Sequence, residues 1–148
     1  MEYVYNDGGR SKYFKGNTGD CVTRAIAIAT GKDYLEVYNA INGISKGERK
    51  RKNERRKSNA RKGVYHHTYE KYLKDLGWRY VDCNKPNKYI HLTDSEIPKG
   101  TVICRLYKHL VCVIDGVIND TYDCSKKGTK FNNEVLDRRI KGYFYKEG

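Results

Sequence analysis

The chain has 148 residues, a net charge of +12 and 32% charged residues, and Leu, Ile, Val and Phe together make up about one fifth of it. This length favours a single domain, residues 1–148, although so low an apolar content approaches that of disordered chains. The deficit is local, because none of those four residue types occurs in 45–62. We therefore expect a small globular domain with a basic mobile insertion at about 45–63.

Composition also excludes several classes of protein. No stretch approaches the about 20 apolar residues of a membrane-spanning helix, and the first residues show neither a basic leader nor an apolar signal segment. The five cysteines are an odd number and include no Cys-x-x-Cys pair, which favours reduced thiols in the cytosol. The sequence therefore predicts a cytoplasmic protein with no membrane partner.

The first predicted elements are helices. After a short apolar start and a polar loop over 6–19, a helix is expected with Cys21 in its first turn and Gly31 at its end, because apolar residues recur with helical spacing at Val22, Ala25, Ile26 and Ala29. Capping residues precede it at 18–20. Asp33-x-x-Glu36 matches a capping box and predicts a second helix through Ile41, and a third is expected over 69–76.

A strongly basic segment follows the second helix. Residues 46–62 read KGERKRKNERRKSNARK, with a net charge of +8 and one apolar side chain, which predicts a mobile loop or a solvated helix. The segment is either an electrostatic patch for nucleic acid or another polyanion, or a soluble surface insertion. Its cationic residues are Lys46, Arg49, Lys50, Arg51, Lys52, Arg55, Arg56, Lys57, Arg61 and Lys62.

From Trp78 the periodicity changes to that of strands. Strands are expected at 78–83, 101–107, 109–114, 117–122 and 140–145. Because the helices precede the strands instead of alternating with them, the sequence predicts an α+β fold with helices packed on one side of a C-terminal antiparallel sheet.

The strongest local signal is the Asp115-Gly116 pair between two apolar runs, which predicts a two-residue type I′ hairpin. Ile114 then lies opposite Val117, and continuing this pairing places His109 and Asp120 as diagonal neighbours about 7–8 Å apart. Cys112 faces the other way, as a small core residue. The face shared with His109 contains Val111, Val113, Ile118, Asp120 and Tyr122.

This arrangement suits a general base and the group that orients it. A neutral imidazole accepts a proton near pH 7, and a neighbouring carboxylate fixes its tautomer and stabilises the imidazolium. The structural alternative is that His109 is an ordinary half-buried side chain and that Asp120 bonds to nearby backbone.

Cys21 is the candidate nucleophile. At a helix start, unpaired backbone N–H groups and the macrodipole favour a thiolate. The other four cysteines, of which Cys124 is the last, lie in or just after predicted strands. His66, His67, His91 and Cys124 show no metal-ligand spacing, so we expect neither a metal site nor a cofactor.

Three motifs together resemble the papain-like cysteine protease superfamily, and within it small papain-like proteins of bacteriophages and bacteria. They are Asn17-Thr-Gly-Asp-Cys21-Val-Thr-Arg-Ala-Ile, Lys108-His109-Leu-Val-Cys-Val-Ile-Asp-Gly and Asn119-Asp120-Thr-Tyr. The resemblance covers 16–43, 72–81 and 97–124 and is absent over the basic segment.

The resemblance implies covalent acyl transfer on a protein or peptide substrate. Cys21 would attack a carbonyl carbon, His109 would carry the proton, and Asp120 would orient His109. The product would be that of a peptidase, isopeptidase or amidase, with acyltransferase as an alternative. The resemblance also suggests a phage-encoded protein that acts on a host protein in the host cytoplasm.

The expected oxyanion hole departs from the family pattern. It would use the Cys21 backbone N–H and a side chain from the preceding loop. The family places a Gln six residues before the nucleophile, where this chain has Lys15. Asn17 is the substitute donor that we expect. Alternatively, Lys15 acts electrostatically, or the hole is incomplete and the protein is a non-catalytic module that binds nucleic acid or a host protein through 46–62.

Overall fold

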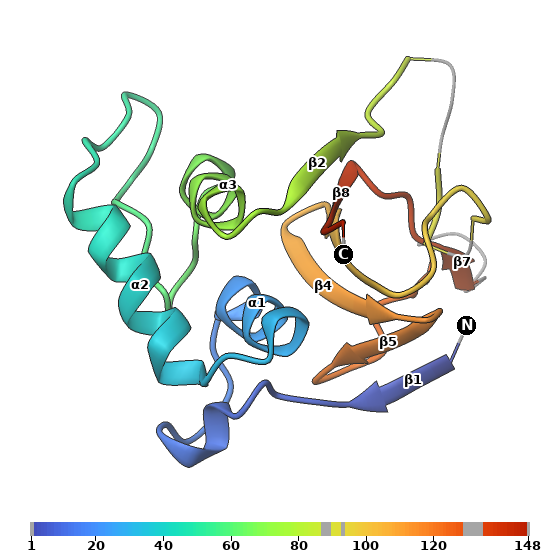
Figure 1. The fold of residues 1–148 in the computed structure, drawn as a ribbon, viewed down its shortest axis with the longest axis horizontal. Coiled ribbons are helices and arrows are strands. Elements are labelled where there is room, and N and C mark those ends of the chain that lie inside the picture. Colours follow the sequence, from blue (N-terminus) through green and yellow to red (C-terminus); the bar gives the residue numbers. More distant parts are fainter. Residues whose placement is uncertain (1, 87–89, 93, 129–134, 148) are drawn as a thin grey trace.

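The computed structural model describes residues 2–86, 90–92, 94–128 and 135–147. These residues form three α-helices and a six-stranded mixed sheet, so the chain is α+β (Figure 1). The helices are α1 (Cys21–Thr30), α2 (Tyr34–Lys46) and α3 (His66–Asp75), and a short 3₁₀ helix spans Arg10–Lys12. The strands are β1 (Glu2–Tyr5), β2 (Arg79–Asp82), β3 (Thr101–Leu106), β4 (His109–Ile114), β5 (Val117–Asp120), β6 (Lys126–Gly128), β7 (Val135–Asp137) and β8 (Gly142–Tyr145).

The sheet differs from the expected antiparallel one at its N-terminal edge. Its strand order is β1-β5-β4-β3-β8-β2, and β6 and β7 pair separately. Every neighbouring pair in the large sheet is antiparallel except β1 and β5, which run parallel with Tyr5 opposite Asp120. The expectation of a purely C-terminal, antiparallel sheet is therefore wrong, because the short apolar start of the chain supplies an edge strand.

The helices form layers on one face of the sheet. Helix α1 packs against β4 and also contacts α2, and Figure 1 shows α1 between α2 and the sheet. Fully buried side chains fill this layer, among them Ile26, Val37, Ile103 and Phe144. None of the helices in the described residues is long and apolar enough to cross a membrane.

The opposite face of the sheet is also covered. Val111, Val113, Ile118 and Ile140 belong to a second buried cluster, whereas Cys112 belongs to the cluster beneath the helices, as predicted. Strand β4 is therefore buried on both faces, which explains its nearly continuous apolar sequence. Because burial of each large apolar side chain contributes about 1.5–3 kcal/mol, this strand is a rigid support for His109 at its start.

The predicted starts of α1 and α2 are confirmed, but their capping is not, and α3 begins at His66, three residues before the predicted start at 69. Helix α1 begins at Cys21 and ends at Gly31, which has a left-handed φ of 72°. Neither Asp20 nor Asp33 caps its helix with its side chain, so the capping box at Asp33 is wrong. The Asp33 carboxylate instead accepts a hydrogen bond from the Tyr13 hydroxyl at 2.7 Å, and α2 continues past the predicted end to Lys46.

The basic segment is anchored at its C-terminal end. The Ala60 side chain is fully buried, its carbonyl accepts a hydrogen bond from Thr23 of α1 at 2.6 Å, and its N–H donates to Asn42 of α2 at 2.9 Å. The Ser58 carbonyl accepts a bond from Ser45 at 2.5 Å. The predicted mobile loop or solvated helix is therefore corrected in one respect: Ser58 and Ala60 are buried, and their backbone bonds to α1 and α2.

Candidate active site

The predicted hairpin is present with the predicted register. Asp115 and Gly116 both have positive φ, 48° and 80°, as a type I′ turn requires. Ile114 pairs with Val117, and the ladder continues to Cys112 and Asn119. Beyond this point His109 and Asp120 are brought together: His109 Nε2 lies 2.6 Å from Asp120 Oδ2. The side chains are 8% and 4% exposed, so this is a buried charged pair.

Asp120 is held in place by several contacts besides the one with His109. Its Oδ1 accepts a hydrogen bond from the Thr121 N–H at 2.7 Å and lies 3.4 Å from Arg24 Nη2. Strand β1 adds a backbone bond, because the Asn6 N–H donates to the Asp120 carbonyl at 2.9 Å. Burial raises the pKa of Asp120, but the bond from His109 and the other contacts lower it below its usual value. Asp120 is therefore a fixed carboxylate at neutral pH.

Cys21, on α1, lies near His109, on β4. The thiol lies at the start of α1, which packs against β4, and both residues line a cleft of about 450 Å³. His109 and the Leu110 backbone N–H lie close enough to the Cys21 thiol to lower its pKa. Because Asp120 engages Nε2, Nδ1 is the ring nitrogen left to exchange a proton with the thiol. The structure thus brings together Cys21, His109 and Asp120.

These contacts favour the charged forms of both groups. Burial raises the pKa of the Cys21 thiol, but the hydrogen bond and charge of His109 lower it below that of an ordinary cysteine. Burial lowers the pKa of His109, but its bonds with Asp120, Cys124 and Cys21 raise it to about 12. The contacts therefore favour a thiolate at Cys21 beside an imidazolium at His109, with Asp120 balancing the extra positive charge.

The other thiols behave differently. All five cysteines lie in the described residues; Cys21 is partly exposed, and the remaining four are buried. Burial raises the pKa of Cys83, Cys104, Cys112 and Cys124. Cys124 also contacts His109, yet its pKa is still raised, so it is a protonated neighbour of the pair. Chemical selectivity for Cys21 therefore follows from its surroundings.

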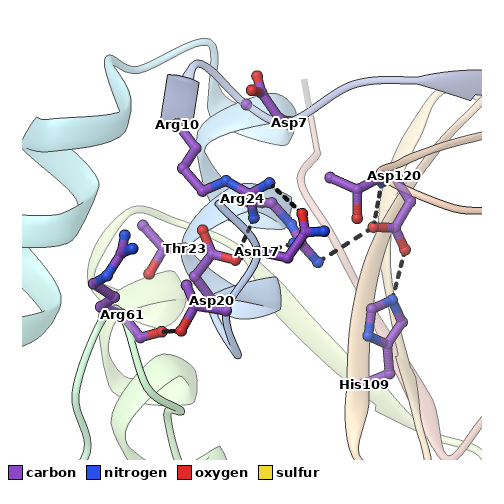
Figure 2. A network of polar contacts seen from close by, with 12 residues as sticks. Asp7, Arg10, Asn17, Asp20, Thr23, Arg24, Arg61, His109 and Asp120 are labelled. Carbon is purple, nitrogen blue, oxygen red and sulfur yellow. Dashed lines mark hydrogen bonds and ion pairs between the residues drawn. The ribbon is translucent and has the colours of Figure 1, made fainter. Parts of the chain in front are cut away.

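A buried charge network joins the start of α1 to the hairpin (Figure 2). Asp20 Oδ1 accepts bonds from Arg10 Nη1 and Arg24 Nη1, both at 3.0 Å, and Asp20 Oδ2 accepts one from the Tyr34 hydroxyl at 2.7 Å. Arg24 then reaches Asp120 with its other terminal nitrogen. The sequence analysis missed this role of Arg24. Its i+4 spacing from Asp20 was a signal for the first contact, but nothing in the sequence placed it beside Asp120.

Asn17, the expected side-chain donor of the oxyanion hole, lies at the exposed edge of this charge network. Asn17 is exposed, and its side-chain oxygen accepts a bond from Arg10 Nη2 at 3.0 Å. That bond leaves the Asn17 amide N–H₂ as a potential donor, although Asn17 is not among the residues that line the cleft. The role of Asn17, like that of Lys15, stays a prediction.

The anchored end of the basic segment forms one wall of the cleft. Lys62 and the three residues that follow the segment, Gly63, Val64 and Tyr65, line it together with Tyr107 and Lys108 of the β3–β4 turn. The Lys62 carbonyl lies so close to Gly19 that a Cβ there would be 2.8 Å from it. Only glycine fits this approach without a backbone shift, which explains the residue type two positions before Cys21.

The other cationic side chains of the segment point outward. Of the ten predicted residues, all are exposed except Arg61, which is partly buried and lies over the Phe14 ring at 4.6 Å. The two acidic residues are engaged on the inner side: Glu48 and Glu54 contact the two ring nitrogens of His67 at 3.1 and 2.9 Å. The exposed face of the segment is therefore more uniformly cationic than its composition indicates.

The histidines considered as metal ligands do not converge. His66 contacts Glu70 and the Tyr69 hydroxyl, His67 lies between its two glutamates, and His91 lies in an isolated bridge with Arg139. Within the described part of the chain, one group has metal-ligand chemistry, with its ligand atoms within 4.8 Å of one another: His109, Asp120 and Cys124. A zinc ion there would need the Cys124 thiolate, whereas burial favours the neutral thiol.

Comparison with known proteins adds no relative. No protein-family model, no curated protein and no solved structure matches this chain.

Proposed function

We propose that the protein is a papain-like cysteine hydrolase that cleaves a peptide, isopeptide or related amide bond through a covalent acyl-enzyme. The observation that supports this most directly is the convergence of Cys21, His109 and Asp120 beside an open cleft, with the lowered thiol pKa confined to Cys21.

In the proposed reaction, Cys21 and His109 each act in both steps, first the acylation of Cys21 and then the hydrolysis of the acyl-enzyme. The Cys21 thiolate attacks the carbonyl carbon, and the imidazolium of His109 gives its proton to the leaving nitrogen as the C–N bond breaks. Water then attacks the thioester carbon and passes a proton to His109, and Cys21 leaves as the thiolate. Asp120 remains ionised throughout and orients the ring. An amine in place of water would make the same enzyme an acyltransferase.

Selective alkylation tests the nucleophile. Chloroacetamide at pH 6.5 should label Cys21 about a hundredfold faster than an ordinary cysteine, whose pKa near 8.5 leaves about 1% thiolate. Peptide mapping by mass spectrometry identifies the labelled residue. Cys21→Ala should remove the fast labelling, and Cys83→Ala, at a buried thiol outside the site, should leave it unchanged.

An activated peptide ester tests the acyl-enzyme itself. The protein should gain the mass of the acyl group on Cys21, and hydroxylamine should remove it. Labelling of Cys21 no faster than that of Cys83, or acylation that persists in Cys21→Ala, would contradict the proposal.

A second candidate function is polyanion binding by residues 46–62. The supporting observation is the outward direction of the cationic side chains while Glu48 and Glu54 face His67. Phosphate contacts would make such binding weaken steeply as salt rises. The two functions are compatible if the segment brings an acidic substrate protein to the Cys21 cleft. Absence of oligonucleotide binding even at low salt would remove the nucleic-acid form of this idea.

A further inference from the structure

The cleft beside Cys21 is cationic. Its charged lining residues are Lys62, Arg105, Lys108 and Lys141, and none of the described residues that line it is acidic. Three of these four lie outside the basic segment: Arg105 is on β3, Lys108 is in the β3–β4 turn and Lys141 directly precedes β8. The positive charge of the cleft is therefore a property of the fold around Cys21 and not an extension of residues 46–62.

Arg105 is half-buried, unlike the exposed Lys62 and Lys108. It is on β3, in the face of that strand turned toward the helices, because its neighbours Cys104 and Leu106 belong to the cluster on the other face. Burial lowers the pKa of Arg105, but interactions of its guanidinium with the nearby Tyr80 and Tyr69 hydroxyls raise it. Both partners are neutral, and no ion pair in the described part of the chain engages Arg105.

At the entrance of the cleft, two ammonium groups lie beside the exposed ring of Tyr107. The ammonium groups of Lys108 and Lys141 lie 5.4 and 5.2 Å from the centre of the Tyr107 ring. Tyr107 is 61% exposed, so this surface is open to a ligand. A half-buried guanidinium near two hydroxyls, with ammonium groups at the entrance, is suited to a carboxylate, which arginine binds through two parallel hydrogen bonds.

We propose that the Cys21 cleft selects peptide substrates carrying an acidic side chain on the acyl side of the scissile bond, and that Arg105 is the residue that recognises this carboxylate. The inference rests on the proposed cysteine hydrolase function. The volume of about 450 Å³ falls within the range of about 300–1,000 Å³ of ligand pockets. A carboxylate here would neutralise Arg105 at a site where water screens the pair only partly.

Matched peptide probes test this selectivity. Each probe is a peptidyl chloromethyl ketone with Glu at the first, second or third position from the ketone, and its control carries Gln at the same position. One Glu probe should alkylate Cys21 about tenfold faster than its Gln control, as expected for a hydrogen bond to a charged group. Rates are measured by intact mass spectrometry.

Three variants test whether the preference for Glu over Gln depends on residues of the cleft. Arg105→Gln should remove the Glu preference, so that each Glu probe alkylates Cys21 at the rate of its Gln control, and urea denaturation shows that the variant is folded. Lys108→Gln, at an exposed lysine of the cleft entrance, should reduce the preference about threefold because exposed charges are screened. Arg79→Gln, an exposed arginine paired with Glu147 outside the cleft, is the matched control and should keep the full preference.

The outcomes separate the two proposals. If Cys21 reacts rapidly but each Glu probe matches its Gln control, or if Arg105→Gln keeps the preference, the substrate assignment is wrong and the hydrolase proposal stands. If neither chloroacetamide nor any peptide probe reacts selectively at Cys21, both are wrong. If a single-stranded oligonucleotide protects Cys21 at moderate salt and glutamyl peptides do not, the cleft binds phosphate and the peptide assignment is overturned.

Discussion

Two regions of this molecule hold their charges in opposite ways. Around the start of α1, Arg10, Asp20, Arg24 and Asp120 are at most 6% exposed, and each contacts an opposite charge. In residues 46–62 the cations are almost all exposed, and their acidic neighbours face inward. Exposed charges are solvated and tolerate substitution, whereas a buried charge depends on its partner. The first region therefore fixes geometry, and the second contributes most of the net charge.

Among the variants that test this difference between buried and exposed charges, Arg24→Met should have the largest effect. Methionine fills similar space but leaves Asp20 and Asp120 without the cation between them, which should lower the free energy of unfolding by about 3–5 kcal/mol. Urea denaturation measures the loss. Arg79→Met removes an exposed arginine from its pair with Glu147 and should cost less than about 1 kcal/mol. Equal losses in the two variants would mean that the buried network does not hold the hairpin.

Asp120→Asn should have the next largest effect, on reactivity. The amide keeps the shape but removes the negative charge that favours imidazolium, so the pKa of the Cys21 thiol should rise toward 8.5. Labelling by chloroacetamide should fall about a hundredfold at pH 6.5 and recover near pH 9, because thiolate forms as pH rises through that pKa. The pH profile of the labelling rate measures this shift.

The matched control for this variant is Asp115→Asn at the tip of the same hairpin. Asparagine tolerates positive φ, so the turn should persist and the labelling profile should not move. A wild-type profile in Asp120→Asn would show that Asp120 does not set the charge state of His109 and Cys21.

The smallest effect on stability is expected in the basic segment. Replacing Arg49, Lys50, Arg51, Lys52 and Arg55 with Gln should change the free energy of unfolding by less than about 0.5 kcal/mol at each position. Oligonucleotide affinity should fall, with a shallower salt dependence. Deletion of the whole of 46–62 should instead destabilise the protein, because it removes Ala60 and its bonds to α1 and α2. Oligonucleotide titration of both variants measures how far the charges contribute to binding, and thermal unfolding measures how far the anchored residues contribute to stability.

Local signals predicted much of the fold. The Asp115-Gly116 pair fixed the hairpin register because few residues accept positive φ at both turn positions. Cys21 at the helix start followed from helical apolar spacing. The parallel pairing of β1 was not predictable in this way, because its four residues carry no information about which distant strand they join. The basic segment was predicted to be a mobile loop or a solvated helix, because composition does not show the hydrogen bonds that its backbone makes.

The sequence by itself determined that a thiol begins a helix and that an imidazole and a carboxylate share a hairpin. Both follow from spacing within a few residues. That Cys21 reaches His109, that Arg24 joins Asp20 to Asp120, and that Arg105 enters the same cleft were decided by the tertiary structure alone. These contacts connect residues far apart in the chain, and their geometry depends on how α1 packs against β4, which no local pattern encodes.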